Sequence, residues 1–275
     1  MKKLSLIFSL LIISALILAG CAQATEAPED EVEEMASITI GYGAPELSGG
    51  QGQIMDSLVS FAQEKDWAVV TTNANFSAEE QANQMDYFIS LGVDAIVTVP
   101  VDSQAICASV EKAKQAGIPF YTIDRAPIGC EINMVVQSDN YLAGQQSGEA
   151  MVALLTEKYG EPMGVVLELQ GDLGQNVAQL RGGGFNDVMA EYPNIEVISV
   201  PTEWRADRFS NAVLDVFGSR DDVDGIYMHS DSVGTQVVLA ALDQIGQKFM
   251  RGEEGHVFMT GVDGFATAAL DSCED

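Results

Sequence analysis

Short apolar runs alternate with amphipathic segments from residue 37 onward. The apolar runs are rich in β-branched and aromatic residues. They cover 37–43, 67–74, 94–100, 118–124 and 132–138 in the first half, then 163–170, 195–202, 224–230 and 256–263 in the second. Runs that stay apolar without strict alternation are typical of strands that are buried on both faces. The pattern therefore predicts two groups of parallel strands.

The segments between these runs have the period of helices. Ile54, Leu58 and Phe61 share one helix face, and similar spacing recurs at 82, 85, 89 and at 106, 110, 113. In the second half, helical patterns cover 141–157, 176–191, 207–217 and 233–246. Helices that alternate with buried strands cover both faces of a parallel sheet. The sequence thus predicts an α/β fold of two Rossmann-like lobes, 38–138 and 139–275, with parallel sheets flanked by helices and a ligand cleft between them.

Polar side chains gather at the predicted carboxyl ends of the strands. These ends are Tyr42–Ala44, Pro100–Ser103, Asp124–Arg125, Ser138–Asn140, Gln170–Asp172, Glu203–Trp204, Ser230–Asp231 and Asp263–Gly264. Ligands of open α/β sheets bind beyond the carboxyl ends of the strands. The set shows no nucleophile–base pair and no metal-ligand cluster, so we expect no catalytic residue, metal or cofactor. A cleft lined in this way suits a neutral, hydroxyl-rich molecule.

The first residues have the pattern of a secretion signal. Lys2 and Lys3 precede an uncharged run that is shorter than the roughly 20 residues of a membrane-spanning helix. The run ends in "LAGC", which resembles a bacterial lipobox with Cys21 as the lipidated residue; the alternative is an ordinary signal peptide with a chance cysteine. Residues 22–37 are acidic and lack apolar periodicity, which predicts an extended tether. We expect a signal peptide at 1–21 and a body that is lipid-anchored outside the cytoplasmic membrane, in the periplasm or at the cell surface.

The charge balance excludes one class of partner. The chain has 13 Lys and Arg against 41 Asp and Glu, a net charge of −28. Nucleic-acid binding needs basic patches that neutralise phosphates, so we expect no nucleic-acid partner. The acidic excess identifies no ligand, and we interpret it as a solubilising surface.

Several motifs, in order and at matching separations, carry a family resemblance. They are "GVDAIVTVPVDS", "AGIPFYTIDR", "QSDNYLAGQQSG", "LELQGDLGQNVAQLRGGGF", "DGIYMHSDS" and "GVDG". Through them the chain resembles the periplasmic sugar-binding proteins of ABC importers, of the ribose-binding type. The resemblance implies a type I periplasmic binding fold and a monomer that captures a monosaccharide or polyol by lobe closure and docks on an ABC permease. It also implies that such proteins continue beyond the Asp263 strand, so we expect a C-terminally truncated chain.

The resemblance assigns the principal ligand-binding residues. Asp124 and Arg125 match a pair that grips sugar hydroxyls: a carboxylate accepts from hydroxyls, and a guanidinium donates to oxygens. Asp263 matches an acid that accepts from the sugar, and Trp204 matches an aromatic that stacks on its apolar face. The structural alternatives are a surface Asp–Arg pair, a turn aspartate before Gly264 and a core tryptophan.

Other positions depart from the ribose-binding pattern. Gln179 stands where a second arginine is expected, while Arg181 matches a different, structural arginine. Ser230 replaces an asparagine, and Ser48 and Gln51 stand in the loop where an aromatic clamp is expected. With Ser138 at the end of its strand, these side chains complete the predicted site. The departures favour another pentose or hexose, a polyol or a furanose over ribose.

The cysteines predict one cross-link. Cys107 begins a helix and Cys130 follows the Asp124–Arg125 loop, so both lie at one sheet edge on neighbouring strands. An oxidising compartment and similar loops in sugar-binding relatives favour a Cys107–Cys130 disulfide over two free thiols. Cys273 has no evident partner.

Two other functions share parts of this pattern. A receptor for a sugar or autoinducer, coupled to chemotaxis or to a histidine kinase, would have the same fold and ligand. An α/β enzyme acting on a sugar or nucleotide would need a catalytic pair or a dinucleotide fingerprint, and the sequence shows neither. "SGGQGQ" lacks the Gly-Lys-Ser/Thr of a phosphate loop. We therefore expect a binding protein and not an enzyme.

Overall fold

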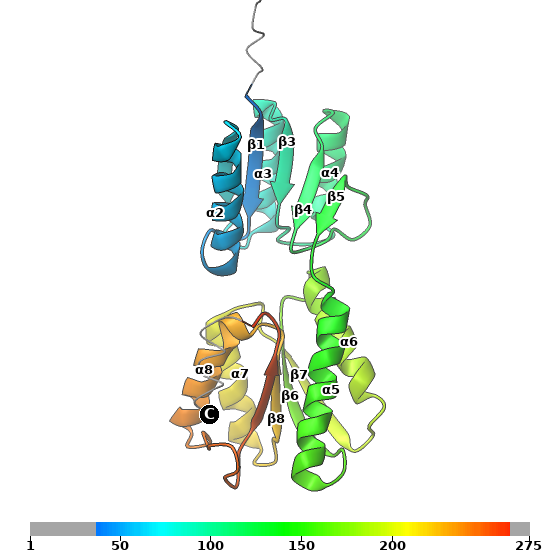
Figure 1. Ribbon diagram of the computed structural model, residues 1–275, viewed down its shortest axis with the longest axis vertical. Helices are drawn as coiled ribbons and strands as arrows, with labels where there is room; N and C mark the ends of the chain where they lie inside the picture. The colour runs from blue at the N-terminus through cyan, green and yellow to red at the C-terminus, as the bar shows by residue number, and fades with distance from the viewer. Residues whose placement is uncertain (1–36, 265–275) are drawn as a thin grey trace, which may run out of the picture. The chain divides into compact units, whose positions relative to one another are not determined.

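The computed structural model describes residues 37–264. The predicted signal peptide, the lipidation site Cys21, the tether up to position 36 and Cys273 lie outside the described residues. Two parallel sheets make up the described part, the first within 39–136 and the second within 164–261 (Figure 1). The predicted α/β class with parallel sheets flanked by helices is confirmed, while the lobe limits 38–138 and 139–275 stay predictions.

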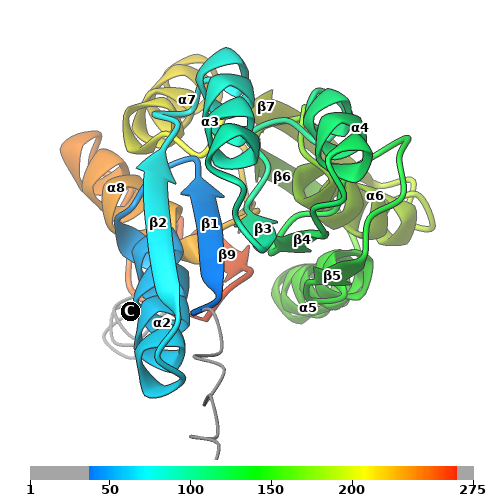
Figure 2. The same ribbon diagram turned by 90° about the horizontal axis from the view of Figure 1, so that it is seen from above.

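The first sheet has five strands in the order β2-β1-β3-β4-β5. The strands are β1 Thr39–Ala44, β2 Ala68–Asn73, β3 Ala95–Thr98, β4 Phe120–Ile123 and β5 Met134–Val136; the helices are α2 Gly49–Glu64, α3 Ala78–Leu91 and α4 Ile106–Gln115. Helices α3 and α4 cover one face, and α2 lies on the other face along β1 and β2 (Figure 2). Met85, Phe88 and Phe120 are fully or almost fully buried in the core on the α3 and α4 side.

The second sheet has four strands in the order β7-β6-β8-β9. The strands are β6 Gly164–Gln170, β7 Ile195–Pro201, β8 Gly225–Met228 and β9 Phe258–Gly261; the helices are α5 Asn140–Tyr159, α6 Asn176–Met189, α7 Ala206–Ser219 and α8 Asp231–Gln244. A core cluster on each face buries apolar side chains, Phe209 and Leu242 in one and Phe185 and Met151 in the other. Burial on both faces explains why the strands read as continuous apolar runs.

Glycines let α5 and α6 approach each other closely. A Cβ atom added at Gly144 would lie 2.1 Å from the carbonyl oxygen of Arg181, and one added at Gly184 would lie 2.0 Å from that of Tyr141. Real Cβ atoms do not approach backbone atoms this closely, so the contact requires glycine. The contact fixes the middle of α6 against the first turns of α5, which sets the position of Arg181.

The predicted cysteine pair meets in the first lobe. Cys107 lies in the first turn of α4, Cys130 follows β4, and their Cα atoms are 5.6 Å apart with the two Sγ atoms at 2.09 Å.

Among residues 37–264, none of the helices combines the length and the apolar character that crossing a bilayer would need.

Candidate functional site

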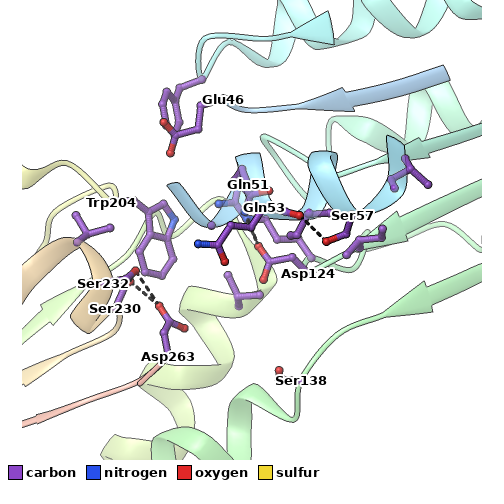
Figure 3. A pocket seen from close by; sticks show the side chains of 18 of the residues that line it. Glu46, Gln51, Gln53, Ser57, Asp124, Ser138, Trp204, Ser230, Ser232 and Asp263 are labelled. Atoms are coloured by element: carbon purple, nitrogen blue, oxygen red, sulfur yellow. Dashed lines mark hydrogen bonds and ion pairs between the residues drawn. The ribbon is translucent and has the colours of Figure 1, made fainter. Parts of the chain in front are cut away.

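A cavity of about 780 Å³ lies beyond the carboxyl ends of strands from both sheets. Its polar lining comprises Glu46, Gln51, Gln53, Ser57, Asp124, Arg125, Ser138, Arg181, Trp204, Ser230, Ser232 and Asp263. Apolar side chains add Ile54, Leu58, Phe61, Phe76, Ile123, Val177 and Val233. Figure 3 shows Trp204, Ser230 and Asp263 facing the same space as Gln51, Gln53 and Asp124. The volume falls within the roughly 300–1,000 Å³ of typical small-molecule sites.

One wall of the cavity is built around Asp124 and Arg125, directly after β4. Arg125 is 6% exposed, and its Nη1 donates to the carbonyl oxygen of Pro100 at 3.0 Å. The Asp124 Oδ2 lies 3.5 Å from the Arg125 Nε and accepts from the Gln51 Nε2 at 3.0 Å. Burial lowers the pKa of Arg125, and the Asp124 carboxylate opposes that shift. The pair therefore presents a buried guanidinium beside a half-buried carboxylate.

The opposite wall holds a second acid–base pair, between Arg181 in α6 and Asp263 after β9. The Arg181 Nη2 lies 3.0 Å from the Asp263 Oδ1, and the Ser230 hydroxyl donates to the Asp263 Oδ2 at 2.6 Å. Arg181 is 7% exposed, its Nε donates to the Asn140 Oδ1 at 2.9 Å, and its Nη1 donates to the carbonyl oxygen of His229. These contacts fix the fork, so that it orients the Asp263 carboxylate toward the cavity.

Trp204 follows β7 and lines the cavity instead of the core. Its indole Nε1 donates to the Gln175 Oε1 at 2.6 Å. The ring lies against Gly171, because a Cβ atom there would be 2.0 Å from the indole Cζ2. The Arg181 guanidinium carbon lies 5.9 Å from the ring centroid. The indole is thus held in one orientation before any ligand arrives.

Backbone strain occurs at residues that line the cavity. Asp124, Trp204 and Asp263 have φ angles of 68°, 59° and 102°, in a region that L-residues seldom adopt. Such strain concentrates at functional sites, where the surrounding structure maintains it. Phe76, which also lines the cavity, has a positive φ as well, whereas Asp66, Asn75 and Glu203 have one outside the cavity.

Seven of the nine side chains predicted to bind ligand line the cavity. They are Asp124, Arg125, Asp263, Trp204, Ser230, Ser138 and Gln51. Ser48 and Gln179 do not belong to the lining: the Ser48 hydroxyl donates to the Glu46 Oε2 at 2.6 Å, and the Gln179 amide donates to the carbonyl oxygen of Leu173 at 2.8 Å. Gln179 is exposed because residues two apart on a helix point to opposite sides, and Arg181 occupies the buried side.

Sequence reasoning missed several lining residues. Arg181, interpreted as structural, contacts both Asp263 and the cavity, and Glu46, Gln53, Ser57 and Ser232 were not singled out. Helix periodicity could have found Ser57, and position at a strand end could have found Ser232. Ser57 follows Gln53 by one turn on α2, and Ser232 lies in the first turn of α8, beyond the carboxyl end of β8.

The chemistry that the lining offers is hydrogen bonding and stacking. Carboxylates, guanidinium groups, amides and hydroxyls surround one indole face, and the lining residues include no His, Cys or Lys. Within residues 37–264, no group of three or more His, Cys, Asp or Glu side chains is arranged to hold a metal ion. The arrangement is suited to holding a polyhydroxylated molecule.

Comparisons with known proteins bear on the family and the fold of the chain. A model described as "Periplasmic binding protein domain" matches residues 50–272. The "Xylitol-binding protein" of Mycolicibacterium smegmatis is 31% identical over 212 residues, which cover 76% of this chain and 58% of the relative. The ribose import binding protein of Escherichia coli is 30% identical, with 71% and 62% covered. The chain thus spans less than two thirds of the length of these curated relatives.

Solved structures show the same architecture. An ABC transporter solute binding protein from Mycobacterium smegmatis with bound glycerol has a TM-score of 0.70 and 26% identity, covering 76% of this chain and 72% of its own. The fructose-binding periplasmic domain of a hybrid two-component system has a TM-score of 0.77 at 22% identity, covering 86% and 77%. The latter likeness shows the fold alone.

Proposed function

The chain belongs to the periplasmic binding protein family, and from that premise we propose that it is an extracytoplasmic solute-binding protein of an ABC importer. It captures a monosaccharide or related polyol and delivers it to the permease. The observation that carries this proposal is the pairing of two carboxylate–guanidinium couples, Asp124–Arg125 and Arg181–Asp263, across a cavity that also holds an indole.

The chemistry of these groups favours a neutral ligand rich in hydroxyls. Each carboxylate accepts from hydroxyl donors, and each guanidinium donates to hydroxyl oxygens. Each charge already has an opposite partner. Removing water from such a pair when a neutral ligand binds therefore costs less free energy than removing water from an unpaired charge. Trp204 supplies a flat apolar surface for the C–H face of a sugar ring or polyol chain.

Capture proceeds by lobe closure. A ligand that contacts residues of both sheets favours the state in which both sets of contacts are made. The connection from the first sheet to the second begins at Gln137–Asn140, after β5, and serves as part of the hinge. Members of this family are substrate-binding proteins, and we extend that to this chain: the ligand leaves unchanged, and the closed form docks on the permease.

The proposal includes the compartment and the attachments. The Cys107–Cys130 disulfide forms outside the cytoplasmic membrane, and Cys21 carries the lipid anchor of a monomer tethered there. The disulfide links the α4 start to the Asp124–Arg125 loop, so it reduces the ordering entropy that is lost on ligand binding.

A thermal-shift screen tests the function. The panel contains xylitol, D-ribose, D-apiose, D-allose, D-arabinose and myo-inositol. A true ligand at a hundredfold excess over its Kd should stabilise the protein by about 2.7 kcal/mol and should be recovered unchanged. Turnover of a panel member, or no response to any sugar or polyol, would contradict the proposal.

Matched variants test the site. Asp124→Ala and Trp204→Ala should abolish the ligand-induced shift. Asp66→Ala is the control for the first, because Asp66 is exposed and also has positive φ, 57°, outside the cavity. Trp67→Phe is the control for the second, because Trp67 is the other tryptophan of the chain and does not line the cavity. Both controls should keep the shift. Unaltered responses in both cavity variants would show that the site is elsewhere.

A further inference from the structure

A buried acid–imidazole pair lies behind the second wall of the cavity. Glu168 of β6 and His229, which follows β8, are both 0% exposed, and the His229 Nε2 lies 2.9 Å from the Glu168 Oε1. The amide of Gly171 donates to the His229 Nδ1 at 3.2 Å. Because Nδ1 accepts, the ring proton is on Nε2, and the ring is a neutral imidazole that donates to Glu168.

Glu168 is held as an acceptor. Its Oε2 accepts from the Ser199 hydroxyl at 2.5 Å and from the Asn186 Nδ2 at 3.1 Å. Burial acts to raise the pKa of Glu168, but hydrogen bonds from His229, Ser199 and Asn186 outweigh burial and lower it. The carboxylate therefore stays ionised and fixes the tautomer of the imidazole.

His229 contacts two groups that shape the cavity. Through Nδ1 it holds the main chain of Gly171, against which the Trp204 indole lies. Through its carbonyl oxygen it accepts from Arg181, the partner of Asp263. A shift of His229 would therefore displace both the stacking surface and the second acid–base pair.

We infer that His229 is a positioning residue: its neutral ring, oriented by Glu168, holds Gly171 and so fixes the Trp204 indole, and a proton on Nδ1 releases that indole. An added proton would place two N–H groups, of His229 and Gly171, opposite each other and remove the hydrogen bond between them. The main chain at Gly171 would then move away from the ring, and the indole would lose its supporting surface. The inference rests on the proposed function only where it concerns ligand affinity.

The charged and titratable groups around the ring set the sign of this effect. They are Glu168 from β6, Arg181 from α6, Tyr227 from β8, which directly precedes His229, and Asp263, which pairs with Arg181. Burial lowers the pKa of His229, the Glu168 carboxylate opposes the shift, and Arg181 adds to it. The neutral ring is thus the form that the fold favours. The neutral His229 ring therefore stabilises the fold at pH values above the ordinary histidine pKa. This stabilisation is lost as the pH falls through the lowered pKa of His229 in the folded protein.

A fluorescence titration tests the inference without any ligand. In a Trp67→Phe background, Trp204 is the sole tryptophan. Lowering the pH from about 8 should shift its emission in one single-proton transition below the ordinary histidine pKa of about 6.5, before the far-UV dichroism changes. His229→Gln offers one donor and one acceptor without a titrating ring, so it should remove the transition. His256→Gln, at the other histidine, should leave it in place.

Xylitol affinity supplies the second readout. Across the same transition it should fall about 3- to 10-fold, the equivalent of one net hydrogen bond. His229→Phe should lose affinity at every pH, and His229→Gln should recover most of that loss. An emission that stays flat until the fold is lost, a transition that persists in His229→Gln, or parental emission in His229→Phe would each overturn the inference. If xylitol does not bind, the emission titration still tests the role of His229. Failure of this inference can therefore be distinguished from failure of the proposed function.

Discussion

At the scale of single residues, the Arg181 side chain connects the cavity to three neighbouring groups. Its three nitrogens donate to the Asn140 side chain, to the His229 carbonyl oxygen and to the Asp263 carboxylate. These three acceptors lie in different directions, and a planar fork can satisfy all of them at once. An ammonium group is a point charge and cannot reproduce that geometry.

Arg181→Lys should therefore weaken both binding and folding. We expect a loss of stability on the order of 2 kcal/mol from unsatisfied buried acceptors, and sugar affinity at least about tenfold lower because Asp263 loses its orientation. Chemical denaturation and calorimetric titration measure the two effects. Arg205→Lys is the control, because Arg205 pairs with Asp207 at an exposed position and should be silent in both measurements. Parental affinity in Arg181→Lys would show that the fork does not position Asp263.

Single residues also show which side chains sequence reasoning placed at the cavity, while their role in ligand binding stays a prediction. Asp124, Arg125, Trp204 and Asp263 follow apolar strands, and the carboxyl end of a strand locates a side chain well. Positions on helices were harder to predict, because a shift of two residues reverses the direction of the side chain. The resemblance assigned Gln179 to the site and Arg181 to a structural role, but the helix turns Arg181 toward the cavity and Gln179 away from it. The Glu168–His229 pair depends on tertiary contacts that no local pattern encodes.

At the scale of elements, the apolar runs predicted every strand of the described part, with ends within a few residues. The largest trimming is at β5 and β9, predicted as 132–138 and 256–263 and observed as Met134–Val136 and Phe258–Gly261; each is an edge strand that pairs with one neighbour. Strand order was not predictable from local pattern, since the placement of β1 between β2 and β3 depends on how the crossovers pack. Within "RGGGF", Gly184 allows the close packing between α5 and α6.

That close packing makes a prediction about α6. Gly184→Ala adds a methyl group that would lie 2.0 Å from the Tyr141 carbonyl oxygen, so α5 and α6 must separate. We expect a loss of about 1–3 kcal/mol in the free energy of unfolding, although alanine favours helix formation. Gly183→Ala lies on the same helix with its nearest atom at 3.9 Å, and should be neutral or stabilising by up to about 1 kcal/mol. Equal denaturation midpoints for the two variants would refute the close-packing argument.

At the scale of the whole molecule, the Cys107–Cys130 link closes a loop with a sequence separation of 23. In the chain-entropy model such a cross-link stabilises the fold by about 3 kcal/mol through its effect on the unfolded chain. The double variant Cys107→Ser/Cys130→Ser should therefore unfold at a lower denaturant concentration than the oxidised parent. In dithiothreitol the two proteins should converge. A difference that persists under reduction would point to packing of the serines, and no difference under oxidation would mean that the bond is not formed.

On the proposed function, charge acts on the ligand at two ranges. Inside the cavity, the guanidinium groups of Arg125 and Arg181 already pair with the carboxylates of Asp124 and Asp263. Glu46 adds a further carboxylate to the lining. At longer range the chain carries a net charge of −28. Both effects oppose an anionic ligand, but they differ in salt dependence, because screening weakens the long-range field more than contacts inside the cavity.

On the proposed function, xylitol and xylitol 5-phosphate separate the two ranges. The phosphate should bind at least about 100-fold more weakly, since like charges placed together cost several kcal/mol. Raising the ionic strength from about 0.02 M to 0.5 M should reduce the difference in affinity between the two ligands without removing it. The Debye length shortens several-fold over this range, so the field of distant surface charges is screened while the contacts inside the cavity persist. Affinity for xylitol itself should hardly change over this range, which calorimetric titration can verify. Tighter binding of the phosphate at either salt concentration would contradict the assignment of a neutral ligand, because the paired guanidinium groups would then have to exchange their carboxylate partners for it.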